Sequence, residues 1–172
     1  MTDTLVELSA NDWFREGVKQ LGLPIPTPQR LRRAHGGVQE RPLEGKTVAV
    51  HGNNVAIGRV LAHTLCGGGA SCLLLGQSET PSFWNEAAEA YARPLTRQSA
   101  IEAQEDAKVH AMIIDATGFR GPEDLRALYD VGHRWIKRIQ RCGRLIVVGR
   151  APAEAKSPAK AAAQAALEGF IR

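Results

Sequence analysis

Residues 51–58, HGNNVAIG, are of the types that can hold a phosphate group. Phosphates bind to backbone N–H groups at the start of a helix, approached through residues without bulky side chains. Gly52 would permit a sharp turn, and Gly58 would let the helix pack closely on the preceding strand. Ala56 stands where another glycine would let the backbone approach a pyrophosphate, so its methyl group narrows the gap. The spacing therefore predicts the phosphate-binding turn of a dinucleotide site.

Two later turns complete this candidate site. Gln77 and Ser78 follow the apolar run 71–75, where dinucleotide sites carry an acidic residue for the ribose or an arginine for a 2′-phosphate. Neither charge type is present, so we expect either no cofactor or weak binding of NAD(P)H. The candidate cofactor-binding residues are Gly52, Asn53, Asn54, Ala56, Ile57, Gly58, Gln77, Ser78, Thr117 and Gly118.

Other side chains near these turns have structural interpretations. Asp115 is expected to cap the turn that it begins, and Thr117 to act as a turn hydroxyl. His51 is interpreted as a hydrogen-bonded turn residue. Cys66 and Cys72 lie in apolar segments and are predicted to be core residues. The cysteines and histidines show no spacing typical of metal ligands, so no metal is expected.

The elements that would position these residues alternate between strands and helices. Apolar runs predict strands at 46–51, 71–75, 109–115 and 145–148. Helices are predicted at 57–66, 84–93 and 160–172, with another that Pro122 opens and that runs to Arg141. This order indicates an α/β fold, a Rossmann-like (flavodoxin-like) three-layer domain with a mostly parallel sheet. Because the last helix has no cap and no following strand, we expect a domain truncated at its C-terminal end.

The first 45 residues have a different character. Asn11 is a plausible N-cap for a short amphipathic helix over 10–21. Three prolines and an arginine-rich stretch follow, typical of an arm lying on a neighbouring surface. We therefore divide the chain into an arm at 1–45 and a Rossmann-like domain at 46–172. Trp13, Phe14 and Trp135 are candidate anchors for a partner, or else core residues.

Composition excludes several classes of protein. The chain has 172 residues, of which 44% are hydrophobic and 23% are charged, so wholesale disorder is excluded. No run approaches the length of a membrane span, and residues 1–7 do not resemble a secretory signal, so we expect a cytoplasmic protein. The net charge of +4 comes from two basic groups, at 30–41 and 134–144. Without aromatic interleaving or a known module, these groups favour solvated surfaces over a nucleic-acid site.

The motifs resemble those of short-chain dehydrogenases/reductases. Residues 46–58 are similar to the T-G-x-x-x-G-x-G opening of that family, and 115–118 (DATG) stand where it carries N-N-A-G. Residues 143–149 (GRLIVVG) resemble its next strand. The segments LGLPIP (21–26), DATGF (115–119) and LEGFIR (167–172) resemble more closely the N-terminal domain of high-molecular-weight 3-oxoacyl-[acyl-carrier-protein] reductases. Residues 77–104 match poorly.

This resemblance implies a degenerate active site. Reduction in the family needs a serine that orients the carbonyl, a tyrosine that donates a proton and a lysine that lowers the tyrosine pKa. The serine position is near Arg150, the tyrosine position holds Lys160 and the lysine position holds Gln164. In the other register, which makes Lys160 the lysine, Lys156 stands at the tyrosine position. No residue of this chain is therefore predicted to be catalytic.

The resulting hypothesis is a non-catalytic reductase-like domain that serves assembly or regulation of a 3-oxoacyl-thioester reductase of fatty-acid metabolism. The resemblance implies a ketoreductase domain, absent from this chain, as its partner, and we also expect a homo-oligomer that contacts neither nucleic acid nor membrane. One alternative is an active NAD(P)H-dependent short-chain reductase. A second alternative is a basic module that binds nucleic acid or an acidic partner.

Overall fold

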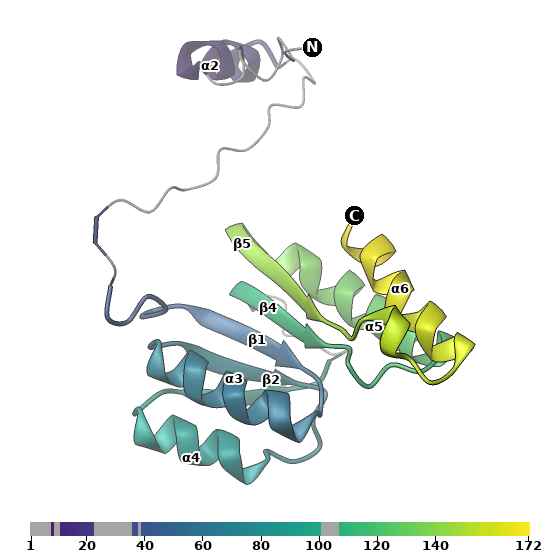
Figure 1. Ribbon diagram of the computed structural model, residues 1–172. Coiled ribbons are helices and arrows are strands. Elements are labelled where there is room, and N and C mark those ends of the chain that lie inside the picture. Colours follow the sequence, from purple (N-terminus) through teal and green to yellow (C-terminus); the bar gives the residue numbers. More distant parts are fainter. Residues whose placement is uncertain (1–7, 9–10, 23–35, 38, 101–106) are drawn as a thin grey trace. The chain divides into compact units, whose positions relative to one another are not determined.

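The structure is a computed structural model that describes residue 8 and residues 11–22, 36–37, 39–100 and 107–172 (Figure 1). The chain divides into two units, Met1–Gly36 and Gly37–Arg172. The first contains helix α2 (Asp12–Gln20), whose N-cap Asn11 accepts a hydrogen bond from the backbone N–H of Trp13 at 3.3 Å. The predicted N-cap is thus confirmed. The proline- and arginine-rich stretch at 23–35 lies outside the described residues.

The second unit is built on a five-stranded sheet. Its strands are β1 (Thr47–His51), β2 (Ser71–Leu75), β3 (Leu95–Gln98), β4 (Val109–Asp115) and β5 (Ile139–Val148). All pairs are parallel and the order is β3-β2-β1-β4-β5. The chain adds β2 and β3 on one side of β1, and then β4 and β5 on the other side. Between β1 and β4, where the strand order reverses in this way, an open α/β sheet leaves a crevice at its carboxyl edge. The predicted α/β Rossmann-like class is confirmed.

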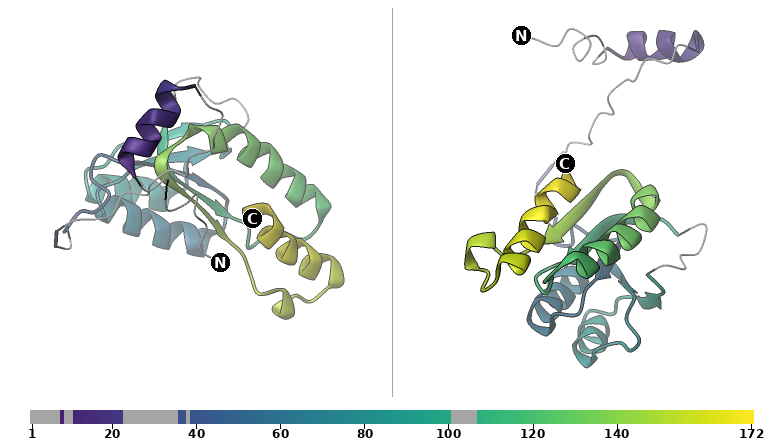
Figure 2. Two further views of the ribbon diagram at one scale, coloured as in Figure 1. Left: turned by 90° about the horizontal axis from the view of Figure 1, so that it is seen from above. Right: turned by 90° about the vertical axis from the view of Figure 1, so that its right-hand side faces the viewer.

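Helices cover the two faces of this sheet (Figure 2). On one face α3 (Val55–Gly67) and α4 (Ser82–Ala90) enclose a core with Val50, Leu74 and Trp84. On the other face α5 (Pro122–Trp135) and α6 (Pro158–Ile171) enclose a core with Met112 and Trp135. Alternate strand residues enter alternate cores because side chains along a strand point to opposite faces.

Two elements differ from the sequence-based expectation. β3 was not predicted, because its residues LTRQ are largely polar at the sheet edge. The helix expected to reach Arg141 ends at Trp135, is followed by the short 3₁₀ helix η1 (Ile136–Arg138), and gives way to β5 at Ile139. The early start of β5 is accommodated by a register shift in its pairing with β4, between Val109 and Ala111. Cys142 in this part of β5 has a φ of 63°. Such a bulge has no periodic apolar signal.

Several predicted core residues are confirmed. Cys66 and Cys72 are buried with their Sγ atoms 3.8 Å apart, and burial raises the pKa of both thiols. Trp135 is fully buried and donates to the carbonyl oxygen of Ala100 at 3.0 Å, so it is a core residue and not a partner anchor. None of the helices formed by the described residues is long and apolar enough to cross a bilayer.

The contact between α5 and α6 can be tested at Gly132. A Cβ atom on Gly132 would lie 2.6 Å from Cζ of Phe170. We expect Gly132→Ala to lower the free energy of unfolding by about 1–3 kcal/mol through overpacking. An alanine in an uncrowded helix would instead stabilise the fold.

The measurement is urea unfolding followed by circular dichroism, repeated in a Phe170→Leu background. The penalty should shrink there because the ring is gone. An equal penalty in both backgrounds would contradict the contact.

Candidate functional site

The turn between β1 and α3 brings two strand ends together. Gly52 has a φ of +135°, and a Cβ atom there would lie 2.5 Å from the Cβ of Asp115 at the end of β4. Only glycine allows both this backbone conformation and this approach. The turn predicted at Gly52 is therefore present.

Asn54 closes the start of α3 with its own side chain. Its Oδ1 accepts hydrogen bonds from the backbone N–H groups of Ala56 at 3.1 Å and Ile57 at 3.3 Å, and its Nδ2 donates to Oγ1 of Thr117 at 3.0 Å. Backbone N–H groups of this kind are the ones that bind a phosphate at a helix N-terminus. Here two of them already have an acceptor within the chain.

A buried carboxylate lies beside this cap. Asp115 is 8% exposed, and its Oδ1 accepts from the backbone N–H and the Oγ1 of Thr117 at 3.0 and 2.6 Å. Its Oδ2 accepts from the backbone N–H of Asn54 at 3.2 Å. Asp115 thus caps the turn it begins, as predicted, and also ties β4 to the turn after β1. We call Asn54, Asp115 and Thr117 the turn network.

Gly58 has a different role from the one expected. A Cβ atom there would lie 2.9 Å from Cζ of Phe83, a residue of α4. The glycine therefore permits close packing of α3 on α4, and not of α3 on the preceding strand. The Arg59 guanidinium lies over the Phe83 ring at 5.6 Å on the exposed side.

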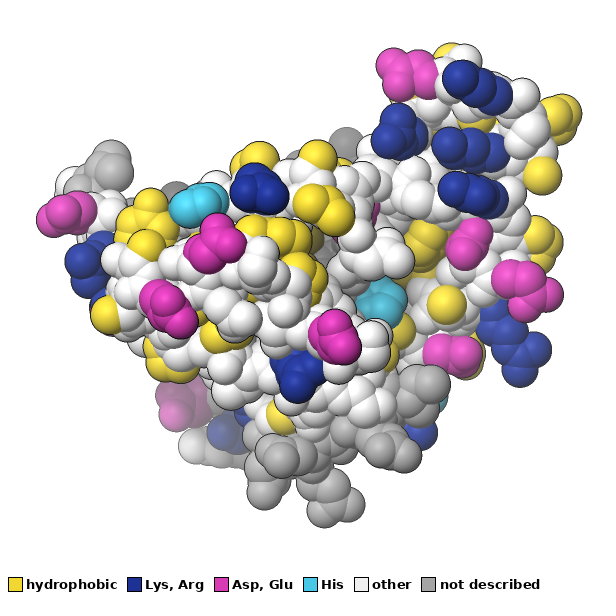
Figure 3. All heavy atoms as spheres, turned by 90° about the horizontal axis from the view of Figure 1, so that it is seen from below, with side chains coloured by type: hydrophobic (Ala, Val, Ile, Leu, Met, Phe, Trp, Pro, Cys, Tyr) yellow, Lys and Arg dark blue, Asp and Glu magenta, His cyan; other side chains and the backbone are white. Residues whose placement is uncertain are grey.

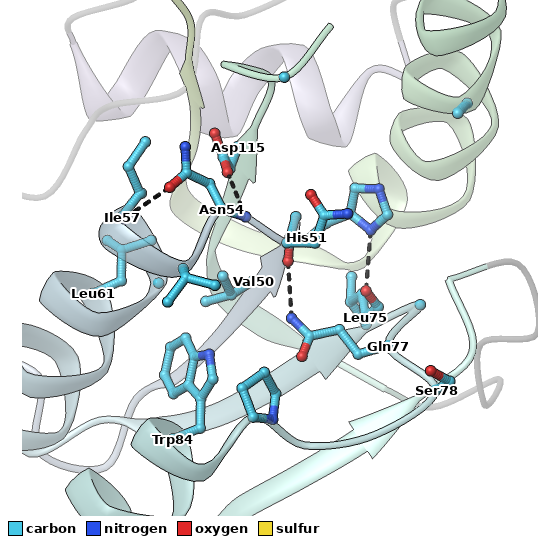
Figure 4. A pocket seen from close by; sticks show the side chains of 18 of the residues that line it. Val50, His51, Asn54, Ile57, Leu61, Leu75, Gln77, Ser78, Trp84 and Asp115 are labelled. Carbon is cyan, nitrogen blue, oxygen red and sulfur yellow. Dashed lines mark hydrogen bonds between the residues drawn. The ribbon is translucent and has the colours of Figure 1, made fainter.

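The opposite wall of the site comes from the end of β2 (Figure 4). Gln77 donates from Nε2 to the carbonyl oxygen of Gly52 at 2.9 Å, whereas its Oε1 is buried without a hydrogen-bond partner. Ser78 is exposed. The ring of His51 bonds through Nδ1 to the carbonyl oxygen of Leu75 at 3.1 Å, and because a carbonyl only accepts, Nδ1 is the donor.

Burial lowers the pKa of His51 below its ordinary value of 6.5, against smaller raising effects of the Leu75 hydrogen bond and the charge of Asp115. The imidazole is therefore neutral near pH 7. Since Nδ1 carries the proton, Nε2 is an acceptor.

These walls enclose a crevice of about 740 Å³ at the carboxyl edge of the sheet. It is lined by all of the predicted cofactor-binding residues except Ala56 and Thr117. Figure 3 shows the protein from below, with hydrophobic side chains in recessed parts of that face and charged side chains around them. No group of three or more potential metal ligands lies within the described part of the chain.

Sequence reasoning missed the second half of this lining. Phe83 and Trp84 enter from the first turn of α4, and Arg120 and Asp124 from the start of α5. Asp124 accepts from the backbone N–H groups of Arg120 at 2.6 Å and Gly121 at 3.3 Å. Pro81 and Pro122 mark both helix starts in the sequence, but no local pattern says that these starts face Gly52.

The three residues at the degenerate catalytic positions lie around α6. Gln164 is 4% exposed, and its Nε2 donates to the carbonyl oxygens of Ala116 at 2.9 Å and Phe119 at 3.2 Å. Its Oε1 accepts from the backbone N–H of Arg150 at 2.6 Å. The Arg150 side chain donates from Nε to the carbonyl oxygen of Thr117 at 3.2 Å. Lys160 is in the first turn of α6, where its backbone N–H donates to Oγ of Ser157.

Comparison with known proteins shows what this fold is similar to. No family model and no curated protein matches the sequence. Solved structures do match. A short-chain dehydrogenase from Shigella flexneri has 17% identity over 77% of this chain and 67% of its own, with a TM-score of 0.63. BdcA in complex with NADPH has 16% identity over 75% and 63%, with a TM-score of 0.57.

A putative short-chain dehydrogenase from Escherichia coli CFT073, complexed with NADPH, has 17% identity over 78% of this chain and 72% of its own, with a TM-score of 0.53. This chain thus spans about two thirds of the length of these structures. At such identities the likeness shows the fold alone, a Rossmann-like α/β fold that these solved structures share with this chain.

The environment of His51 makes a prediction about pH. Because its pKa is lowered in the folded protein, the unfolded chain takes up a proton at His51 at a higher pH than the folded chain does. The stability that this histidine contributes is therefore present above pH 6.5 and is lost as the pH falls through the folded pKa. His51→Asn keeps an N–H donor but does not titrate, so it should lose less stability on acidification.

The measurement is the free energy of unfolding by urea at a series of pH values between about 7.5 and 5. Curves of equal slope for the wild type and His51→Asn would contradict the assignment.

Proposed function

We propose that this chain is a reductase-like domain that does not itself reduce ketones and that serves assembly or regulation of a 3-oxoacyl-thioester reductase. The observation that carries the proposal is Gln164. At the position where the resemblance implies a catalytic lysine, a buried amide holds together the loops that follow β4 and β5. Both N–H groups of this amide are bonded inside the protein and its oxygen accepts from a backbone N–H, so the buried side chain has no donor left for a cofactor ribose or a tyrosine hydroxyl.

The other two positions support the same proposal. Arg150 stands near the serine position with its guanidinium bonded to the carbonyl of Thr117, and it has no hydroxyl with which to orient a substrate carbonyl. Lys160 stands at the tyrosine position. A lysine amine lacks the hydroxyl group of a phenol that a neighbouring cation positions and acidifies.

The two tyrosines of the sequence are elsewhere. Tyr91 follows the last turn of α4, where it packs edge-on to His63 and lies beside the position of a Gly67 Cβ at the end of α3. Tyr129 is 60% exposed on α5 and stacks on His133. Since α3 runs away from the crevice, its last residue lies at the opposite edge of the sheet. The Tyr91 phenol therefore lies too far from Gln164 to be a proton donor there.

An uncovered part of the sheet supports the assembly role. On the face where α3 and α4 cover β1, β2 and β3, no helix formed by the described residues of Gly37–Arg172 covers β4 and β5 (Figure 1). Ile146 of β5 is 43% exposed there, and Val148 is only partly buried. Parallel sheets are normally covered on both faces. We assign this surface to contact with another subunit, in an oligomer to which a ketoreductase domain also belongs.

The absence of catalysis is tested with purified chain, NADPH and acetoacetyl-coenzyme A. We expect NADPH oxidation no faster than without protein. An active 3-oxoacyl reductase assayed in parallel controls for the reagents. Turnover that scales with the concentration of this chain and is abolished by Arg150→Ala or Lys160→Ala would contradict the proposal and establish a reductase.

Self-association is tested by sedimentation velocity at micromolar concentration. We expect the wild type to sediment as an oligomer and Ile146→Asp to shift it toward the monomer, because a carboxylate in an apolar interface costs several kcal/mol unless it is paired. Ile171→Asp is the matched control, since this isoleucine is 51% exposed on α6, a helix that packs on the other face of the sheet. A monomeric wild type, or equal effects of both variants, would contradict the assigned surface.

A further inference from the structure

The two edges of the sheet differ in how well they can accept a further strand. β3 forms one edge with four residues, LTRQ, that are mostly polar, and β5 forms the other edge with the apolar run LIVV at 145–148 (Figure 1). A short strand with a charged side chain, such as Arg97 of β3, protects an edge against pairing, whereas a long apolar strand promotes it. Within Gly37–Arg172, no strand formed by the described residues pairs with the outer side of β5.

The backbone groups of this run alternate between the two sides of β5. The backbone N–H of Ala116, the residue after β4, donates to the carbonyl oxygen of Val148 at 2.8 Å. The N–H and C=O of Val148 therefore face β4, as do those of Ile146, because successive residues of an extended strand turn these groups to opposite sides. The N–H and C=O groups of Leu145 and Val147 consequently face away from β4. No described residue forms a hydrogen bond with them.

The side chains of the same run make this edge apolar. Leu145 and Val147 pack partly buried on the face that α5 and α6 cover. Ile146 and Val148 point to the opposite face, where Ile146 is 43% exposed and Val148 is partly buried. None of the four is charged, and none is a proline that would lack an N–H. An edge of this kind binds a further strand, with main-chain hydrogen bonds supplying the affinity.

We infer that β5 of one copy of this chain pairs antiparallel with β5 of a second copy, across a two-fold axis at Ile146. In this register Leu145 lies opposite Val147 of the second copy, and each such pair exchanges both of its N–H···O bonds. The outward groups of the run on one copy thus bond to those of the same run on the other. The inference rests on the assembly role proposed above, and it names the strand through which two copies bind each other.

Symmetry and charge favour a second copy as the partner in this register. An antiparallel pair of identical strands is isologous, so a single edge supplies both halves of the interface. Arg144 lies opposite Val148 of the second copy, which avoids the destabilising placement of two arginines directly opposite each other. The two Ile146 side chains meet at the axis as a non-hydrogen-bonded pair, where side chains are closest, and lose apolar surface to each other.

The main test removes the outward N–H of Val147. Val147→Pro should leave the ladder with β4 intact, because this N–H points away from β4 and proline is tolerated at such positions of an edge strand. Val147→Ala is the matched control, since it also loses the valine side chain but keeps the N–H. In sedimentation equilibrium, Val147→Pro should raise the dimer dissociation constant about tenfold or more, and Val147→Ala should change it little. Circular dichroism shows whether both variants fold like the wild type.

A cross-link tests the register and decides the matter if Val147→Pro does not fold. Across a non-hydrogen-bonded antiparallel pair the Cα atoms lie about 4.5 Å apart, which a disulfide can span. With oxidised glutathione as the oxidant, Ile146→Cys should form a covalent dimer, as two thiols give one disulfide and two molecules of reduced glutathione. The wild type, which contains the partly exposed Cys142, and Ile171→Cys on α6 are the controls and should not cross-link.

The outcomes separate this inference from the proposed function. A folded Val147→Pro that associates like the wild type, or an Ile146→Cys variant that cross-links no more than Ile171→Cys, would overturn the pairing and leave the proposed function in place. A monomeric wild type would overturn the pairing together with the self-association, and would leave this edge to a strand of a different protein. Turnover in the reductase assay would contradict the proposed function and leave the pairing unaffected.

Discussion

The rest of the site depends on the hydrogen bonds that the Asp115 carboxylate accepts. It is buried at the end of β4 and stable there because three donors, one from the turn after β1 and two from Thr117, satisfy it. A buried charge without such partners would cost several kcal/mol. Gly52 must be glycine because a Cβ atom would overlap the Asp115 side chain. The carboxylate thus sets the path of the turn that begins α3, and with it the shape of the crevice.

Gln164 performs a similar task on the other side of the switch point. Its amide joins the loop after β4 to the loop after β5 through hydrogen bonds to three backbone groups. Together, Asp115 and Gln164 join the carboxyl ends of three strands through hydrogen bonds made inside the protein. The Rossmann-like scaffold is therefore stabilised from within by these two side chains.

The crevice shows that a glycine motif does not by itself identify the ligand. The HGNNVAIG segment forms the strand, turn and helix that its glycines indicate. Its electrostatic character, however, comes from Glu79, Asp115 and Asp124, which belong to three other segments. A glycine pattern reports backbone conformation and close approach. It carries no information about which charges distant segments bring to the same place.

The sequence by itself determined the alternation of strands and helices, the α/β class and the turn at Gly52, because local periodicity and glycine placement depend only on neighbouring residues. It also identified Asn11 as a helix cap and Cys66 and Cys72 as core residues. Only the tertiary structure decided that Gly58 packs against Phe83, that Trp135 lies in the core, and that β5 begins at Ile139 with a bulge. It alone joined Asn54 to Thr117 and Gln164 to Ala116. These pairs are 48 or more residues apart in the chain, and a hydrogen bond between such residues exists only once the strands that carry them lie side by side.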